Sequence, residues 1–290
     1  MTSSVVNAMT KNVSNLIILL VAQILVSANS FAEPKGLALI PLPSIADYTS
    51  GDGWASAVGL KMAHSSVYDG ADTYALEINP EFAIQWRSAE HVFFLDAANI
   101  DGLELGWRAL MQNDWFMQAG VRHETVLPAG DTLAANINNF PHRGSHVIAF
   151  LESRHAIGRG WRNWVSGRLS AGPASFGYRG LMAVGHSFAG KLDGTGIVVV
   201  LFSSVADKKN INNYFGITQS DAAASGLAQA DLSGGYRSTR LKLTYRKNLM
   251  DNMQITIQAG LEIYSDNIKK SAIVRDTSET SAAISALWRF

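Results

Sequence analysis

Hydrophobic and polar residues alternate along several stretches of this chain, most regularly between residues 253 and 264. Every second residue there is apolar, and the residues between them are mostly polar. A period of two is typical of a β-strand with one apolar and one polar face. Residues 240–246 alternate in the same way, so the two stretches predict neighbouring strands. The apolar face of the first stretch consists of Met253, Ile255, Ile257, Ala259, Leu261 and Ile263.

Earlier stretches predict further strands by the same alternation. They cover residues 54–62, 74–86, 103–108 and 115–124. Pro80 lies on an apolar face, where its missing N–H is expected to interrupt the hydrogen-bond ladder. Length and turn spacing also predict strands over residues 146–155, 161–171, 176–188 and 195–203, the last of which is apolar on both faces. The count is about twelve strands, with ten or fourteen as the alternatives.

Composition indicates where the apolar faces point. Hydrophobic residues make up 47% of the chain and charged residues only 17%, against roughly 25% charged residues in an ordinary soluble domain. Only the N-terminal region holds a long apolar run, and that run is shorter than the roughly 20 residues of a membrane-spanning helix. A weakly charged chain of alternating strands is typical of an all-β, antiparallel transmembrane β-barrel.

Aromatic residues favour this barrel over a soluble β-sandwich, which also has alternating strands. Barrels in outer membranes carry aromatic girdles at both membrane interfaces. Tryptophans lie near the predicted strand ends, which suits such girdles. They are Trp54, Trp86, Trp107, Trp115, Trp161, Trp164 and Trp288.

Connection lengths support the strand count independently. Short links are predicted near residues 87–90, 112–114, 157–160 and 248–252. Long connections near 125–145, 204–235 and 265–280 all fall on the other side of the barrel. If the first strand starts in the periplasm, the short links are periplasmic turns and the long connections are external loops.

Residues 1–32 are predicted to be a cleaved signal peptide. An apolar core over Leu16–Val26 follows Lys11 and precedes the small residues Ser30 and Ala32, the order that a signal peptide has. We expect cleavage after Ala32, so that residues 33–290 form the barrel. An anchor helix is the alternative, but the core is too short to cross a bilayer. Met9 is the expected initiator because the basic residue follows it closely.

The last ten residues predict a strand that ends on an aromatic residue. Ala282, Ile284, Ala286, Trp288 and Phe290 share one face. This segment resembles the C-terminal signal read by the barrel assembly machinery of the outer membrane. The resemblance implies that Ile284, Trp288 and Phe290 form the assembly signal and that this machinery is a partner.

Three motifs resemble those of the MipA/OmpV family, the MltA-interacting proteins. Residues 214–217 (YFGI) with 224–227 (ASGL) are similar to the family's YFG…SGL segment, and residues 271–276 (SAIVRD) to its SPIV(R/K)D segment. Residues 68–72 (YDGAD) are similar to its YxGSD turn, although Ala71 and Ala272 depart from the pattern. The motif residues are Tyr68, Gly70, Tyr214, Phe215, Gly216, Ser225, Gly226, Leu227, Ile273, Val274, Arg275 and Asp276.

The family resemblance implies an outer-membrane location and contact with outer-membrane lipid. It also implies a scaffolding role linked to murein hydrolase and synthase partners. The residues themselves predict only that the segment from Tyr214 to Leu227, with its aromatic-Gly and Ser-Gly-Leu turns, makes a long loop compact.

Candidate catalytic chemistry is sparse. The absence of cysteine excludes disulfides and thiolate sites, and a net charge of zero gives no field that recruits nucleic acid. His186 lies in a predicted strand without a catalytic motif, and His142 and His146 flank Arg143 in a loop, where solvated histidines are more common than a metal or anion site. We therefore predict no enzyme activity and no cofactor.

Charged residues on the polar faces are expected to line the lumen, and their arrangement leaves two functions open. A packed network of opposite charges would fill the barrel and leave an interaction protein, whereas separated charges would leave a small polar channel. The family resemblance alone favours the scaffold, with a porin-like channel for polar solutes as the alternative. The carboxylates are Glu77, Glu81, Glu104, Glu124 and Glu262, and the cations are Lys61, Arg108, Arg122, Arg168, Arg240, Lys242 and Arg246.

Overall fold

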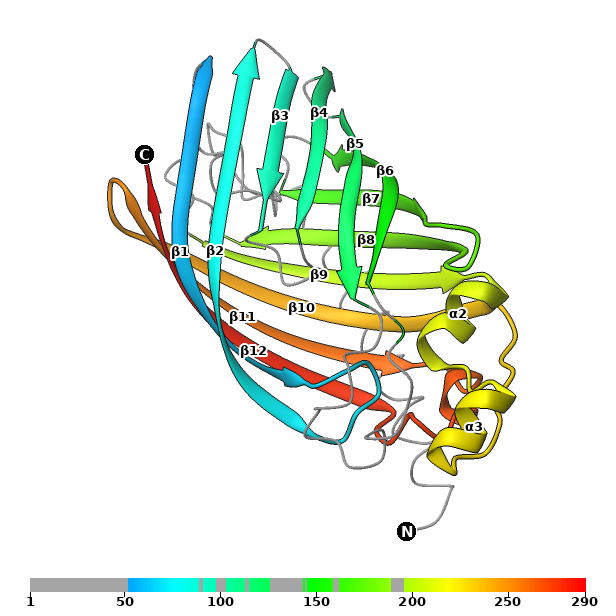
Figure 1. Cartoon of the computed structure of the whole chain (residues 1–290). Helices are drawn as coiled ribbons and strands as arrows, with labels where there is room; N and C mark the ends of the chain where they lie inside the picture. Colours follow the sequence, from blue (N-terminus) through cyan, green and yellow to red (C-terminus); the bar gives the residue numbers. More distant parts are fainter. Residues whose placement is uncertain are drawn as a thin grey trace.

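Twelve antiparallel strands close into a barrel in the computed structural model, because β1 pairs with β2 on one side and with β12 on the other (Figure 1). This confirms the predicted fold class and strand count. The strands are β1 (Gly53–Ser66), β2 (Tyr74–Ser88), β3 (His91–Asp96), β4 (Glu104–Gln112), β5 (Trp115–Thr125), β6 (Ser145–Ile157), β7 (Asn163–Ala171), β8 (Tyr178–Phe188), β9 (Gly196–Ala206), β10 (Gly235–Met250), β11 (Met253–Tyr264) and β12 (Ser278–Arg289).

The structure describes most of the chain after its N-terminal region. The described residues are 52–88, 91–97, 103–112, 115–125, 143, 145–158, 162–188 and 196–290. The predicted signal peptide, its cleavage site and the Met9 start lie outside them. Their assignment stays a prediction.

The alternation of residue types decides which side chains face outward. Along β11, Gln254 and Thr256 are buried inside the barrel, and Ile257 is exposed on its outer surface. Along β1, Leu60 is exposed and Lys61 is buried inside. The outer surface is therefore apolar and the inner surface is polar. Closure also gives each of these twelve strands a paired neighbour on both sides, and backbone pairing of this kind is what the bilayer core requires.

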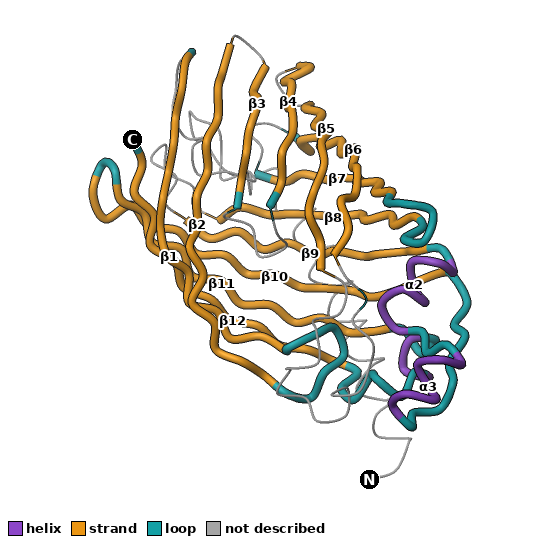
Figure 2. Tube along the Cα trace, viewed as in Figure 1, coloured by secondary structure: helices purple, strands orange, loops and turns teal. Residues whose placement is uncertain are grey.

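The two ends of the barrel differ in their connections. At one end, successive strands are separated by as few as two residues, as between β2 and β3, between β4 and β5, and between β10 and β11. We call this the short-turn end. The strand ends that flank the longest connections, 126–144, 207–234 and 265–277, are at the other end, which we call the cap end. Two helices, α2 (Lys208–Phe215) and α3 (Gln219–Ser225), and the 3-10 helix η4 (Ile268–Lys270) belong to these connections, and α2 and α3 are seen at this end in Figure 2.

Within the described residues, no helix is both long and apolar enough to span a membrane.

Aromatic side chains on the outer surface mark both ends of the barrel. Trp54, Trp86 and Trp288 are exposed near the short-turn end, and Tyr178 and Tyr236 are exposed near the cap end. Aromatic side chains therefore lie near both ends, as in interfacial girdles, but these exposed tryptophans mark only the short-turn end.

Trp164 is the exception, and its predicted place in a girdle is wrong. Only 1% of its surface is exposed, and it packs inside the barrel. Its cross-strand partner is Gly185, where an added Cβ would lie 2.1 Å from the indole. The missing side chain of Gly185 therefore makes room for the indole in the lumen. Trp161 lies outside the described residues.

The predicted interruption at Pro80 is also wrong, since β2 runs through it. Pro80 pairs with Leu60 of β1. The ladder between β2 and β3 spans only Ala83 to Ser88 on β2. Pro80 thus lies where β2 has no partner on its β3 side among the described residues, and there a missing donor is tolerated.

Candidate functional site: the folded cap

The three motif segments, far apart in the sequence, meet at the cap end. The Tyr68 hydroxyl donates to the carbonyl oxygen of Ile273 at 3.0 Å, across 205 residues. The Ser271 hydroxyl donates to the carbonyl oxygen of Phe215. The first motif therefore binds the third, and the third binds the second.

Gly70 sits at the centre of this contact. Its φ of +89° lies in the left-handed region that favours glycine. Its carbonyl oxygen accepts hydrogen bonds from the amides of Arg275 (2.7 Å) and Asp276 (3.1 Å), and its own amide donates to the Glu279 carboxylate. An added Cβ would lie 3.1 Å from Val274. A glycine at this position lets the first connection close onto the third motif.

The second motif follows α2, which begins with a side-chain cap. The Asp207 carboxylate accepts a hydrogen bond from the Asn210 amide at 2.8 Å. Such a cap satisfies one of the orphan amides of a first turn. Tyr214 and Phe215 at the end of α2 are buried, whereas Lys208 is exposed. The helix therefore presents its aromatic C-terminal residues to the barrel.

The short helix α3 is capped at both ends by residues of its own segment. Thr218 and Asp221 form a capping box, in which each side chain accepts a hydrogen bond from the other residue's amide. Gly226, with φ +74°, ends the helix in the left-handed conformation. The Ser225 hydroxyl donates to the carbonyl oxygen of Asp221 at 2.7 Å. These local bonds confirm the hypothesis that this long connection is compact.

Arg143 clasps the junction between the two helices. Its guanidinium donates to the carbonyl oxygens of Asn212 (2.9 Å), Asn213 (2.8 Å) and Gly216 (2.5 Å), and to the Asp221 carboxylate (2.9 Å). Partial burial opposes ionisation of Asp221, but the Thr218 amide and hydroxyl and the Arg143 guanidinium outweigh it and lower the pKa of the carboxyl. The carboxylate is therefore stabilised in its charged form.

An apolar cluster fills the space beneath these contacts, and we call it the cap cluster. It includes inward-facing Ile148 of β6 and Tyr264 of β11, two strands on different sides of the barrel. A contiguous cluster that joins them extends across the lumen. Its buried members are Tyr68, Ala71, Ile148, Phe176, Ala206, Ile211, Tyr214, Phe215, Ile217, Leu232, Tyr264, Ile268 and Ile273.

The remaining motif residues surround the cap cluster without joining its buried core. Leu227 and Val274 are partly buried and pack against it. Gly216 ends α2, and its amide donates to the Asn212 carbonyl oxygen at 3.0 Å. Arg275 has an exposed side chain and contributes its backbone amide.

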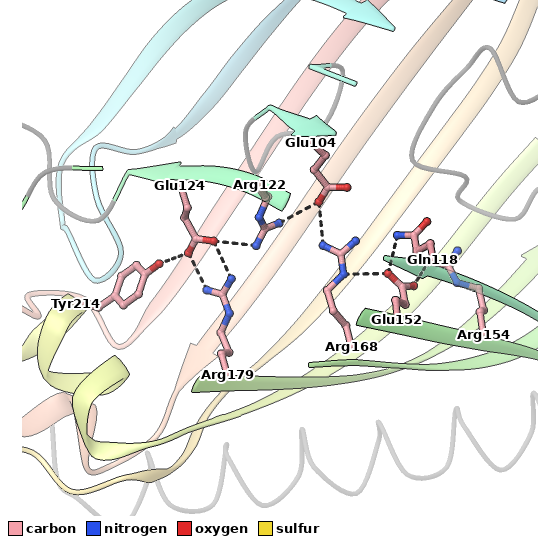
Figure 3. Close-up of polar contacts among 9 residues, drawn as sticks. All are labelled: Glu104, Gln118, Arg122, Glu124, Glu152, Arg154, Arg168, Arg179 and Tyr214. Atoms are coloured by element: carbon pink, nitrogen blue, oxygen red, sulfur yellow. Dashed lines mark hydrogen bonds and ion pairs between the residues drawn. The ribbon is translucent and has the colours of Figure 1, made fainter. Parts of the chain in front are cut away.

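Tyr214 connects the cap to the charged wall of the lumen, as Figure 3 shows. Its hydroxyl donates to the Glu124 carboxylate on β5, which also accepts from Arg179 at 2.8 and 2.9 Å and from Arg122 at 2.8 Å. Burial, followed by the Glu124 charge, raises the pKa of Tyr214. The phenol therefore stays protonated and acts as a hydrogen-bond donor.

The same wall continues from strand to strand as a chain of ion pairs (Figure 3). Glu104 accepts from Arg122 at 3.5 Å and from Arg168 at 2.9 Å, and Arg168 also donates to Glu152 at 2.9 Å. Glu152 in turn accepts from Arg154 and from Gln118. Opposite charges are therefore packed together along β4 to β8, as in the first of the two arrangements that the sequence left open.

Sequence reasoning missed two residues of the cap. Arg237 pairs with Asp69, and its guanidinium lies 4.8 Å from the Tyr214 ring centre and 5.3 Å from the Phe215 ring centre. Arg143 was considered only as a neighbour of two histidines. Their local sequences carry no signal of a role, because each acts on segments that are distant along the chain.

Two of the assembly-signal residues lie on the outer face of β12, and the third, Phe290, directly follows that strand. Ile284 and Trp288 are exposed there, and Phe290 has 74% of its surface exposed. Phe290 is tied to β1 by its backbone amide, which donates to the Ser56 carbonyl oxygen at 2.8 Å. Their role as a signal stays a prediction.

The structure describes two of the three histidines that were considered as candidate site residues. His146 packs edge-on against Phe176 in the cap, and His186 lies 2.6 Å from the Asn163 side chain. His142 lies outside the described residues. Among the residues that the structure describes, no group of three or more His, Cys, Asp or Glu side chains is arranged to hold a metal ion.

Comparison with known families decides the relationship. The family described as "MltA-interacting protein MipA" matches residues 58–290. The chain belongs to this family. The predicted family membership is thereby confirmed, and the match covers every described strand except the first residues of β1. With its closed barrel and apolar outer surface, this MipA-family chain is an outer-membrane β-barrel protein, as predicted.

Solved barrels are similar in fold at low sequence identity. An outer membrane channel from Pseudomonas putida F1 has a TM-score of 0.47 and 10% identity, over 90% of this chain and 100% of that chain. The Ralstonia pickettii toluene transporter TbuX has a TM-score of 0.41 and 11% identity, over 83% of this chain and 90% of that chain. No curated protein sequence matches this chain.

Proposed function

We propose that this MipA-family barrel is an outer-membrane scaffold that holds a murein lytic transglycosylase at the membrane. The description of the family as MltA-interacting supports a partner of this class. We further propose a murein synthase as a second partner, and no catalytic activity of the barrel itself.

The folded cap is the observation that carries this proposal. A pore needs a continuous aqueous path, whereas the cap cluster joins inward-facing residues of β6 and β11 and is fixed to the wall through Tyr214 and Glu124. Burying aromatic side chains of this size is stabilising by about 1.5–3 kcal/mol each. The cap is therefore a stably folded part of the protein, and it favours an interaction protein over an open channel.

A small polar channel is the second candidate, because charged residues line the lumen on most strands. Lys61 and Glu81 pair at 3.3 Å on the wall formed by β1 and β2, and the ion pairs of Figure 3 line β4 to β8. A polar lumen suits transport of polar solutes if the cap opens. The two functions differ in one measurable property, which is conductance.

Co-purification and conductance test the proposal together. The refolded barrel should retain a purified MltA-type transglycosylase on an affinity column and should form no steady pores in a planar bilayer. Phe215→Asp, which places a charge in the cap cluster, should open the cap and produce pores. Ala223→Asp adds the same charge at an exposed position of α3 and should produce no pores in the bilayer.

Two results would contradict the scaffold. Steady pores of defined size in the unmodified protein would make transport the function. Failure to retain the transglycosylase, with a barrel that migrates as folded on gels, would remove the proposed partner while leaving the fold intact.

A further inference from the structure

Five arginines line the lumen close to the short-turn end. Each lies at an inward position among the five residues of its strand nearest that end. Their inward direction follows from the register: Arg87 and Arg108 both pair with buried Val92, and Arg289 pairs with buried Ala57. The five are Arg87 on β2, Arg108 on β4, Arg154 on β6, Arg246 on β10 and Arg289 on β12.

Acidic side chains are distributed differently along the lumen. In the same five-residue zone of the twelve strands, none of the described inward positions is Asp or Glu. The inward carboxylates lie further toward the cap end, and most of them pair there with lysines and arginines. They are Glu81, Asp96, Glu104, Glu124, Glu152, Glu262 and Glu279. The inner wall of the short-turn mouth is therefore basic, although the whole chain has no net charge and Asp52 and Asp251 lie just beyond the strand ends there.

Aromatic rings hold two of these arginines in place. The Arg108 guanidinium lies 5.1 Å from the Phe94 ring centre. The Arg154 guanidinium lies 5.1 Å from Phe116 and 4.6 Å from Trp164, and it also pairs with Glu152. A guanidinium on an aromatic face keeps N–H groups at its edge for hydrogen bonds. These contacts hold the two guanidinium groups in position before any ligand binds.

The wall across from them combines arginines with neutral polar groups. Arg289 donates to the Asn248 side chain at 2.6 Å, and Arg246 pairs across the sheet with Thr256. The Thr256 hydroxyl and the Gln254 carbonyl oxygen are buried, and neither has a hydrogen-bond partner among the described residues. Buried polar atoms are usually hydrogen-bonded, so the Thr256 hydroxyl is positioned to donate to a polar guest.

We propose that this basic mouth is a binding site for small anions that carry carboxylate or phosphate groups and enter from the short-turn end. Arginine forks match the geometry of both groups, and rings of basic residues favour anions in pores. A low-dielectric wall around the mouth concentrates the field of these charges. Arg246 and Arg289 hold the anionic group, Thr256 donates to it, and Arg108 and Arg154 set the potential from the opposite wall.

Calorimetric titration of the refolded full chain in neutral detergent tests this site. Citrate is the carboxylate probe and inorganic pyrophosphate is the phosphate probe. We expect one or both to bind, with affinity that falls as salt is added. The double variant Arg246→Gln with Arg289→Gln should bind at least about tenfold more weakly, the loss expected for one charge-assisted hydrogen bond. Arg87→Gln, at the rim, should weaken binding less.

Lys242→Gln is the matched control, because it removes an inward positive charge from the same strand as Arg246 but further from the mouth. It should leave the affinity within about twofold of the original, a change that screening of a distant charge allows. The site is refuted if neither probe binds the unmodified protein, or if Lys242→Gln weakens binding as much as the double variant. Either result leaves the scaffold proposal untouched, since no transglycosylase takes part in the measurement.

Discussion

Two apolar clusters occupy opposite ends of the lumen, and they are built in different ways. The cap cluster joins connections that are as much as 205 residues apart in the chain, as Tyr68 and Ile273 are. The basal cluster, which consists of Phe116, Trp164, Ala183, Val198 and Val200, is formed only by inward residues of β5, β7, β8 and β9.

The difference indicates which cluster the barrel needs. Basal residues are fixed by strand register, so the cluster forms when the wall forms. Cap residues are fixed by hydrogen bonds between connections, such as those of Gly70 and Arg143. The cap is therefore a unit that can be loosened while the barrel persists.

Phe290→Asp should have the largest effect, because it removes both clusters by preventing the barrel from forming. Phe290 is exposed in the folded protein, so its contacts explain only a modest loss of stability. As the proposed end of the assembly signal, it is instead needed before folding. We expect the variant to be missing from outer-membrane fractions and degraded in the periplasm, as measured by immunoblotting.

Refolding in detergent provides the control for Phe290→Asp, since no assembly machinery is present there. The variant should refold and show heat-modifiable migration on gels. Normal levels of the variant in the outer membrane of cells would show that the C-terminal strand is not the assembly signal.

Phe215→Ala and Phe116→Ala compare the two clusters directly. Both side chains are buried, and truncation of a buried phenylalanine costs about 3–5 kcal/mol. Phe215→Ala should destabilise the cap, so protease should cut within residues 207–234 while the heat-modifiable barrel remains. Phe116→Ala should instead destabilise the barrel and lower the melting temperature of the barrel. Equal lowering by both variants would mean that the cap is not a separate unit.

The sequence predicted the wall better than the cap, for a physical reason. Period two assigns each strand residue to one face, so Leu60 and Lys61 were placed correctly from their order alone. The segment 195–203, which is apolar on both faces, contains most of β9, and its inward Val198 and Val200 belong to the basal cluster.

Contacts of the cap had no such periodic signal. Arg237 binds Asp69 across 168 residues, and nothing near either residue indicates the other. Trp164 was misplaced because a position near a strand end does not tell on which face of the strand the residue lies, and only the small partner Gly185 shows that the indole fits inside. The family motifs located the cap segments, but the fold was needed to show that they meet.

Gly70→Ala should loosen the cap by a smaller amount. A left-handed conformation costs an alanine about 1–2 kcal/mol, and the new Cβ would also press on Val274 at 3.1 Å. Gly226→Ala is the matched control, because Gly226 has a similar φ of +74° and nothing within 4 Å of an added Cβ. Protease cleavage of the cap should therefore increase more for Gly70→Ala. An equal increase would show that contact with Val274 contributes nothing.

The smallest effect should come from acid, through Asp221. The pKa of this carboxyl is lowered in the folded cap, so its contribution to stability is present above the ordinary pKa of aspartate and is lost as the pH falls through the lowered value. Protonation weakens the capping box of α3, an interaction of about 1 kcal/mol, and the salt bridge to Arg143, whose two side chains are largely buried. Pepsin, which is active in acid, should cut residues 216–227 increasingly as the pH is lowered. Asp221→Asn cannot ionise, so its cleavage should be faster at the upper end of this range and should depend less on pH. If the unmodified protein and Asp221→Asn show the same pH dependence, another carboxyl controls the cap in acid, and the clasp by Arg143 does not depend on the charge of Asp221.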